Sequence, residues 1–399
     1  MGKKNVVIAG AGKIGRGYLA ELFQEGGYHT TFLVNSPKKT EQLRAQGSYI
    51  IFRGNKEETA VEEVMISGYD AYCTETDQAQ CVQALVDTQY AMLPVYPVAC
   101  PDLGKLLAQA INRKAAESPE EAFDIYMCVN FLQSTKIIRE CILPHLDEAG
   151  KAYFDKNVGI TETLVGRLVV DATPEMLAKD PLAISAGYGD SLYADPDALK
   201  AGVPEGVRVG LQDRLGARFT YKIWSTNMKH FAVSLYGSYL GYTYVREATI
   251  DPYAEKCVRE MADNEAVYGV AAEYGLTAEE VKRAFARDPW ATWSNPESND
   301  GFARVVFDMR RKLSKPDRVI GPALACLKGG KIPFFLASIA ALAMIYHNPE
   351  DPPSCELKEI LEKDGVFGVL REFSGLSEED KDERMLMELI RDQYIALNK

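Results

Sequence analysis

The chain begins with a short apolar segment, residues 4–9, that runs directly into the sequence GAGKIGRG. Three glycines in this sequence have the spacing G-x-G-x-x-G, and a helical pattern at 16–25 and a second β-rich segment at 30–35 follow. Strand, glycine turn, helix and strand form the context in which this spacing binds the pyrophosphate of a dinucleotide at a helix N-terminus. We therefore predict a dinucleotide-binding site that contains Gly10, Gly12, Lys13, Ile14 and Gly15.

The end of the second β-rich segment indicates which dinucleotide to expect. An acidic residue about 20 residues after the glycines usually binds the adenosine ribose hydroxyls of NAD. Here the segment continues Leu33, Val34, Asn35, Ser36, without a carboxylate. Asn35 can bond a ribose hydroxyl, whereas Ser36 and the two following lysines can hold a 2′-phosphate. We add Asn35 and Ser36 to the predicted cofactor site and expect NAD, with NADP as the open alternative.

Further β-rich and helical segments alternate up to about residue 145. The β-rich segments are 49–52, 61–66, 90–95 and 124–129, and the helical ones are 41–46, 78–86, 103–115 and 135–145. The first two β-rich segments suggest a hairpin, and the alternation as a whole predicts an α/β, mostly parallel, doubly wound sheet. Ligands bind beyond the carboxyl ends of the strands in such a sheet. Asn130 follows the strand at 124–129, so it is a candidate site residue; the alternative is an ordinary turn or helix cap.

The second half of the chain is mainly helical. A Gly-, Asp- and Pro-rich region between 151 and 211 forms the transition, and we expect a dinucleotide-binding domain at 1–213 and a helical substrate domain at 214–399. Thr277 and Glu280 form a capping box, and Ser377-x-x-Asp380 suggests the start of the last helix. The apolar stretch 333–346 is too short to span a bilayer and is predicted to be a buried helix.

One long helix is predicted over Tyr221 to Glu247. On a helical wheel one side is apolar, and the other carries Lys222, Asn227 and His230 above two glycines that would let a ligand or backbone come close. A lysine removed from water has a lowered pKa and can act as a base near neutral pH. The alternative is a lysine whose ammonium reaches water, beside a histidine satisfied within the core.

Composition narrows the class of protein. The formal net charge of −12 argues against non-specific binding to nucleic acid or to an anionic membrane. No signal peptide precedes the first strand, and the eight cysteines show no C-x-x-C pair, so we expect a cytoplasmic protein with reduced thiols. The four histidines lie far apart, so no metal site is expected. A basic run, 310–318, makes binding of a small anion plausible within this acidic chain.

Several segments together resemble a known family. In chain order they are GAGKIGRG (10–17), MCVN (127–130), VGITETLVGR (158–167), YKIWSTNMKHFAVSLYG (221–237) and RKLSKPDRVIGPA (311–323). The chain resembles the long-chain polyol-specific dehydrogenases, most closely the branch of mannitol-1-phosphate 5-dehydrogenases. The resemblance implies an N-terminal Rossmann-type sheet, a mainly helical C-terminal domain and a nicotinamide cofactor without a metal.

The resemblance also implies roles for four residues. Lys222 would be the general base in alcohol oxidation and the acid in the reverse direction. Asn130 and Asn227 would polarise the carbonyl and bind the developing alkoxide, and His230 would fix the substrate hydroxyls or the hydrogen bonding of the lysine. Preorganised donors around one oxygen supply the large electrostatic part of such catalysis, and the cofactor supplies the hydride chemistry.

The chain departs from the family pattern at several positions. The residue before Asn130 is Val129, not an acid; Val34 stands where an Asp is expected; V-G-P is replaced by Val95-Tyr96-Pro97, and V-D-R by Val165-Gly166-Arg167. Ser185-Ala186-Gly187 also lacks an expected carboxylate. These changes bear on the choice of cofactor and polyol, while the lysine is retained.

The expected reaction converts mannitol 1-phosphate and NAD to fructose 6-phosphate and NADH, with small-molecule partners only. One alternative is the same chemistry on a free polyol or hexuronate, of the mannitol 2-dehydrogenase, tagaturonate reductase or fructuronate reductase type. The other is a dinucleotide-binding sensor without turnover, against which the intact Lys222, Asn227 and His230 argue.

Overall fold

The protein forms two compact units, Met1–Gly216 and Ala217–Lys399. A computed structural model describes residues 4–54, 61–189, 192–285, 290–295 and 300–398, and each unit is considered separately below. Among these residues, every helix is too short or too polar to cross a membrane.

Unit 1 contains an eight-stranded sheet in the order β12-β11-β8-β7-β6-β1-β2-β5. Neighbouring strands are parallel except β11, which runs antiparallel to β8. The strands are β1 Asn5–Ala9, β2 His29–Val34, β5 Asp70–Cys73, β6 Tyr90–Leu93, β7 Phe123–Met127, β8 Val158–Val165, β11 Leu192–Ala194 and β12 Val209–Leu211. The predicted doubly wound parallel sheet is therefore confirmed, with β5 and β8 as strands that the sequence pattern did not indicate.

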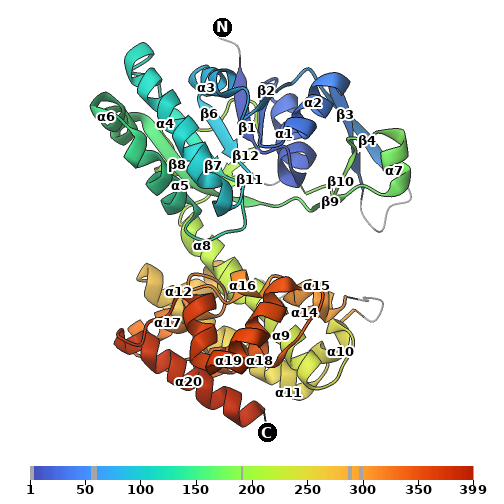
Figure 1. Ribbon diagram of the computed structural model, residues 1–399, viewed down its shortest axis with the longest axis vertical. Coiled ribbons are helices and arrows are strands. Elements are labelled where there is room, and N and C mark those ends of the chain that lie inside the picture. Colours follow the sequence, from blue (N-terminus) through green and yellow to red (C-terminus); the bar gives the residue numbers. More distant parts are fainter. Residues whose placement is uncertain (1–3, 55–60, 190–191, 286–289, 296–299, 399) are drawn as a thin grey trace. The chain divides into compact units, whose positions relative to one another are not determined.

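Both faces of this sheet are covered, as parallel sheets require. Alternate residues of β1 point to opposite sides: Val6 and Ile8 join one buried cluster, and Val7 and Ala9 join another. The second cluster is covered by α3 Gln78–Val86, α4 Cys100–Glu117, α5 Ser134–Ile142 and α6 Glu148–Asn157. The first is covered by α1 Ala20–Glu25 and α2 Pro37–Gln46 (Figure 1).

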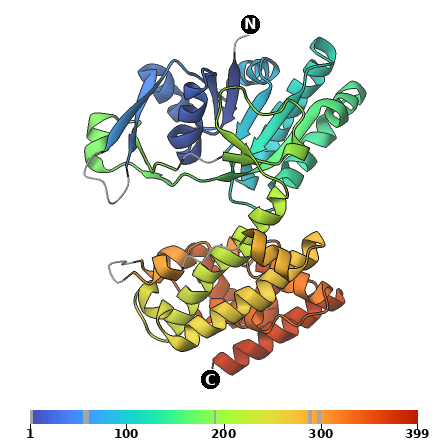
Figure 2. The same ribbon diagram turned by 180° about the vertical axis from the view of Figure 1, so that it is seen from behind.

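A second, four-stranded sheet packs on the far side of α1 (Figure 2). It has the order β4-β3-β10-β9 and consists of β3 Ser48–Arg53, β4 Glu62–Ser67, β9 Val169–Asp171 and β10 Ile184–Ala186, with α7 Pro174–Lys179 between the last two strands. The predicted hairpin is confirmed, since β3 and β4 are antiparallel. β10 runs parallel to β3, so the transition region of the sequence folds back to complete this sheet.

Buried charges connect this small sheet to α1. Glu21, 1% exposed, accepts from Arg167 at 2.6 Å and from Arg53 at 2.6 Å. Three charged groups thus leave water together, and each has a partner of opposite sign, which is the condition for burying them without a large penalty.

Unit 2 is helical. Its elements run from α8 Leu215–Tyr221 through α9 Met228–Tyr239, α10 Val245–Thr249, α11 Pro252–Glu260, α12 Val267–Tyr274, α13 Ala278–Phe285, α14 Trp290–Trp293, α15 Phe302–Val306, α16 Met309–Lys312, α17 Ile320–Lys328, α18 Phe334–Ile345, α19 Pro352–Ser374 and α20 Lys381–Leu397. The buried helix expected at 333–346 is α18, which packs on α9 and α20. The capping box is present at Thr277 and Glu280, but the last helix is capped by Asp380 and not by Ser377.

Candidate active site

The glycine turn after β1 has a backbone conformation that two of its three glycines are needed to form. Gly10 has φ of +126° and donates its N–H to Leu33 O at 2.8 Å, which ties the turn to β2. A Cβ at Gly15 would lie 2.0 Å from the Gly10 carbonyl oxygen, whereas a Cβ at Gly12 would meet no atom within 4 Å. Gly10 and Gly15 are thus required by the fold. Gly12 leaves open space beside the backbone, as the close approach of a pyrophosphate demands.

A cavity of about 650 Å³ opens beside this turn at the carboxyl ends of β1, β2 and β5. Its lining includes Gly10, Asn35, Thr74 and Glu75, with α4 forming the facing wall. A cavity at this end of a parallel sheet fits the adenosine part of a dinucleotide. Two residues of the predicted cofactor set, Gly10 and Asn35, therefore meet in one cavity.

The other predicted cofactor residues have different surroundings. The Nζ of Lys13 forms an ion pair with Asp171 at 2.8 Å, and Ile14 packs against the apolar cluster under α1. The Ser36 hydroxyl accepts the Lys39 N–H at 3.3 Å and so caps α2. None of these three side chains lines the cavity.

Asn130 is exposed and lies in the turn after β7. Three residues later, the backbone of Gln133 has an unusual conformation. Gln133 has φ of +59°, a left-handed conformation that costs free energy for a non-glycine residue. The carboxyl group of Glu162 on β8 is mostly buried nearby, and burial raises its pKa to about 7 while the Ser134 N–H opposes that shift. This turn therefore combines the predicted amide with backbone strain and a carboxyl that titrates near neutral pH.

The helix predicted over Tyr221 to Glu247 is confirmed as far as Tyr239 and is wrong beyond it, and a π-helical segment joins its two α-helical parts without a break. α8 ends at Tyr221, residues Lys222–Asn227 form a π-helical segment, and α9 runs from Met228 to Tyr239. Gly241 has φ of +84° beyond the end of the helix, and Gly237 lies against the side chains of Phe302 and Ala248. The two glycines therefore serve helix termination and packing, not ligand approach.

The π-helical segment nevertheless keeps the predicted polar face. Lys222, Asn227 and His230 are half-buried, whereas the apolar side of the same stretch, including Trp224, Met228 and Phe231, is fully packed. A π-helix widens each turn and turns side chains out of α-helical register, and such segments occur frequently at functional sites. Three of the four predicted catalytic residues are therefore half-buried within the stretch 222–230 of unit 2, and Asn130 belongs to unit 1.

His230 is held by an aromatic ring and a carboxylate. Its imidazole stacks on the indole of Trp293, and its Nε2 lies 3.3 Å from Asp300 Oδ2, without the angle of a good hydrogen bond. Asp300 is itself paired with Arg304 at 2.5 Å. Burial lowers the pKa of His230 to about 4, more than Asp300 raises it. The imidazole is therefore neutral at physiological pH and can both donate and accept a hydrogen bond.

The basic run at 310–318 is mostly neutralised by carboxylates. Arg310 pairs with Glu356, Arg311 with Asp308, Lys315 with Glu383, and Arg318 with Asp317. Lys312 differs: it is 5% exposed, and no carboxylate among the described residues forms an ion pair with it. Its Nζ lies over the Phe231 ring at 5.9 Å, and burial together with Arg318 lowers its pKa to about 7. The lowered pKa means that Lys312 loses its proton more readily than an ordinary lysine, and a bound anion would favour its charged form.

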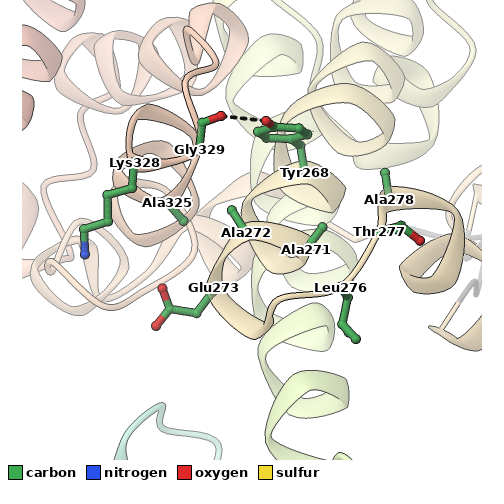
Figure 3. A pocket seen from close by; sticks show the side chains of 10 residues that line it. All are labelled: Tyr268, Ala271, Ala272, Glu273, Leu276, Thr277, Ala278, Ala325, Lys328 and Gly329. Carbon is green, nitrogen blue, oxygen red and sulfur yellow. Dashed lines mark hydrogen bonds between the residues drawn. The ribbon is translucent and has the colours of Figure 1, made fainter.

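A second cavity, of about 390 Å³, lies between α12, α13 and α17 (Figure 3). Its floor is formed by small apolar side chains, and the Tyr268 hydroxyl that faces it donates to Gly329 O at 2.6 Å. None of the predicted site residues lines it. This cavity is therefore separate from the predicted site residues.

Sequence reasoning missed Glu75, Trp293, Asp300 and the special position of Lys312. Glu75 follows the four-residue strand β5, which is too short for a clear alternating pattern. Its signal was the polar turn T-E-T-D just before a helix. The contacts of the other three depend on distant parts of the chain that sequence spacing does not bring together.

Fold and site together define a dinucleotide-dependent dehydrogenase with a separate helical unit. The family model for the mannitol dehydrogenase Rossmann domain matches residues 4–204, and that for the mannitol dehydrogenase C-terminal domain matches residues 218–394. The chain therefore belongs to the mannitol dehydrogenase family and is a polyol dehydrogenase.

Relatives in sequence agree with this assignment, and a solved structure is similar in fold. Mannitol-1-phosphate 5-dehydrogenase of Oceanobacillus iheyensis is 24% identical over 99% of this chain and all of that protein. The protein of the same name from Lacticaseibacillus casei is 25% identical over 92% of this chain and 94% of its own length. In fold, the chain is similar to Pseudomonas fluorescens mannitol 2-dehydrogenase, solved with NAD and D-mannitol, at a TM-score of 0.74 and 15% identity over 100% of this chain and 92% of that one.

Proposed function

We propose that this chain interconverts mannitol 1-phosphate and fructose 6-phosphate, with NAD as the cofactor. The observation that carries the proposal is the half-buried stretch with Lys222, Asn227 and His230, which brings an amine and two hydrogen-bonding side chains together in one segment. Relatives that match the chain over almost their whole length are named for this reaction. The glycine turn and its cavity support a nicotinamide dinucleotide as the cofactor.

In the proposed mechanism Lys222 moves the proton. During oxidation its neutral amine takes the proton of the substrate hydroxyl, and in the reverse reaction its ammonium returns it to the alkoxide. The nicotinamide supplies the hydride acceptor when it is bound. The side-chain amide of Asn227 donates an N–H group to the oxygen on which negative charge develops, which lowers the barrier through preorganised electrostatics.

His230 positions the substrate in this proposal. A neutral imidazole fixed between Trp293 and Asp300 can bond a sugar hydroxyl without adding charge beside Lys222. A second positive charge there would lower the affinity of Lys222 for the proton that it must accept.

Lys312, for which the described part of the chain provides no ion-pair partner, supports a substrate with an anionic end. Lys312 and the buried Arg318 both lie close to residues of α9. Lys312 lies over the ring of Phe231, and the charge of Arg318 is close enough to lower the pKa of His230. A phosphate would supply the negative charge that Lys312 lacks, through charge-assisted hydrogen bonds. A hexuronate carboxylate would meet the same ammonium and is the second candidate, while a free polyol would leave it unpaired.

A turnover screen tests the proposal. Fructose 6-phosphate, fructose and a ketouronate are each offered with NADH and with NADPH, and we expect efficient turnover of fructose 6-phosphate. Turnover of the ketouronate or fructose without turnover of fructose 6-phosphate would contradict the proposed substrate. Lys222→Ala should lower kcat by about 10²–10⁴-fold while NADH still binds; unchanged kcat would remove Lys222 from the mechanism.

A further inference from the structure

In dinucleotide-binding sheets, a carboxylate at the end of the second strand usually binds the adenosine ribose. The end of β2 in this protein has no carboxylate. Leu33 and Val34, at the end of this strand, are 2% and 4% exposed, and they pack into the two cores on either side of the sheet. Asn35 is the polar residue that β2 offers to the cavity. An amide alone can bond a ribose hydroxyl, but it carries no charge with which to reject a 2′-phosphate.

The neighbouring strand β5 brings a carboxylate to the same place. β2 and β5 are parallel, with Val34 paired to Cys73, and Thr74 N donates to Val34 O at 2.9 Å. The next residues on the two strands therefore lie side by side, about 5 Å apart. Glu75 follows directly and lines the same cavity as Asn35 and Gly10.

The turn after β5 leaves the Glu75 side chain available. The other acid of this turn, Asp77, accepts the Cys73 N–H at 2.8 Å and pairs with Arg44 at 2.5 Å, so it holds the shape of the turn. The carboxylate of Glu75 is exposed and, within the described part of the chain, forms no hydrogen bond or ion pair. Asp77 is thus structural, and Glu75 is free to bind a ligand.

The two lysines that follow β2 in the sequence do not line the cavity, and the lysine that lines it is paired with a carboxylate. Lys38 and Lys39 do not line the cavity, and Lys39 is partly buried near Arg16 and Asp180. The lysine that does line it, Lys105, sits on α4 in the facing wall and pairs with Asp102 at 3.1 Å. The charged residue that lines the cavity next to Asn35 is therefore the acidic Glu75.

We propose that Glu75 binds the adenosine ribose hydroxyls and, together with Asn35, selects NAD over NADP. This inference rests on the proposed function, because it assigns a role within the cofactor site of that reaction. The carboxylate accepts hydrogen bonds from the 2′- and 3′-hydroxyls of NAD. The 2′-phosphate of NADP would bring two negative charges against it. The chain thereby replaces the absent acid of β2 with one from the adjacent strand.

The experiment compares Glu75→Gln with Glu41→Gln by fluorescence titration of NADH and NADPH, without substrate. Both variants lose one exposed carboxylate, but Glu41 lies on α2 and does not line the cavity. For Glu75→Gln we expect the Kd for NADH to rise about tenfold or more and the preference for NADH over NADPH to fall by about 10–100-fold. Glu41→Gln should change neither quantity.

The outcomes separate this inference from the proposed function. A wild-type protein that binds NADPH as tightly as NADH, or a Glu75→Gln variant whose preference stays within twofold of wild type, would overturn the role of Glu75 and leave the dehydrogenase reaction intact. A wild-type protein that binds neither cofactor would overturn the proposed function itself. Thermal unfolding of both variants checks that the turn after β5 remains folded.

Discussion

The imidazole of His230 lies parallel to the indole of Trp293, with ring centroids 4.5 Å apart and an angle of 13° between the planes. The indole removes water from one face of the imidazole, and the surrounding protein lowers the pKa of His230 to about 4 even though Asp300 lies close by. Desolvation thus outweighs the attraction of a single carboxylate that is already paired with Arg304. The stacking keeps His230 neutral and fixed in orientation.

This environment predicts how stability depends on pH. An unfolded histidine takes up a proton near pH 6.5, whereas the folded protein resists protonation of His230 down to about pH 4. The contribution of His230 to the free energy of unfolding therefore falls as the pH drops from about 6.5 to about 4, by up to about 3 kcal/mol. When the pH is lowered from 7 to 4.5, the free energy of unfolding should decrease less in His230→Asn than in the wild type. Urea denaturation at several pH values measures this difference.

Comparing the wild type with His230→Asn separates the contribution of His230 from that of other titrating groups. The buried carboxyls of Glu162 and Glu265 have pKa values raised to about 7, so they act in the opposite direction, and they are present in both proteins. Parallel curves of stability against pH for wild type and variant would contradict the buried neutral histidine.

Two glycines of the same turn should respond differently to alanine. At Gly15 the new Cβ would lie 2.0 Å from a backbone oxygen, so Gly15→Ala should destabilise the protein by about 1–3 kcal/mol or more. At Gly12 the Cβ would meet only open space, so Gly12→Ala should keep wild-type stability while the Kd for NADH rises about tenfold or more. Thermal unfolding and NADH fluorescence measure the two effects. Gly12→Ala with unimpaired NADH binding would show that the cofactor does not approach this backbone.

The buried ion pair of Glu21 should matter to the fold and not to the chemistry. In Glu21→Gln the guanidinium of Arg167, whose side chain is 1% exposed, faces a neutral amide. We expect a loss of about 3–5 kcal/mol in the free energy of unfolding, because a buried charge loses its partner. The control on the same helix is Glu25→Gln, which breaks an exposed pair with Arg208 and should cost less than about 1 kcal/mol. Equal losses in the two variants by urea denaturation would refute the special role of Glu21.

Local patterns in the sequence predicted local structure well. The glycine spacing indicated the turn after β1, β-rich segments indicated β1, β2 and the β3–β4 hairpin, and the capping box indicated the start of α13. Each of these depends on residues within a few positions of one another, so propensity and hydrophobic periodicity carry enough information.

Features that depend on distant contacts could not be predicted in this way. The parallel pairing of β3 with β10 joins residues more than 130 positions apart, and the π-helical segment at Lys222–Asn227 departs from the helical period on which a wheel relies. The basic run looked uniform in the sequence, yet four of its cations have carboxylate partners and Lys312 has none among the described residues. Which charge is left for a ligand is decided by tertiary packing.

Lys312 provides a test of the anionic end of the substrate. In Lys312→Met the aliphatic length is kept and the ammonium is lost. We expect KM for fructose 6-phosphate to rise by about 10–100-fold, because a charge-assisted hydrogen bond to phosphate is removed. KM for free fructose, where it is turned over, should change little. The control is Lys328→Met, which removes an exposed lysine of the second cavity and should leave both values unchanged.

Because the pKa of Lys312 is lowered, the uptake of a proton on substrate binding provides a second test. At pH 8 an amine whose pKa is about 7 is mostly neutral in the free protein, and a bound phosphate stabilises its charged form, so binding should take up close to one proton. Calorimetric titration of mannitol 1-phosphate into the protein saturated with NADH, a pair that cannot react, measures this uptake in buffers of different ionisation enthalpy. Proton uptake should decline toward pH 6, where the amine is already charged, and should disappear in Lys312→Met. If the variant takes up as many protons as wild type at pH 8, the phosphate is bound by a different group and Lys312 is not part of the substrate site.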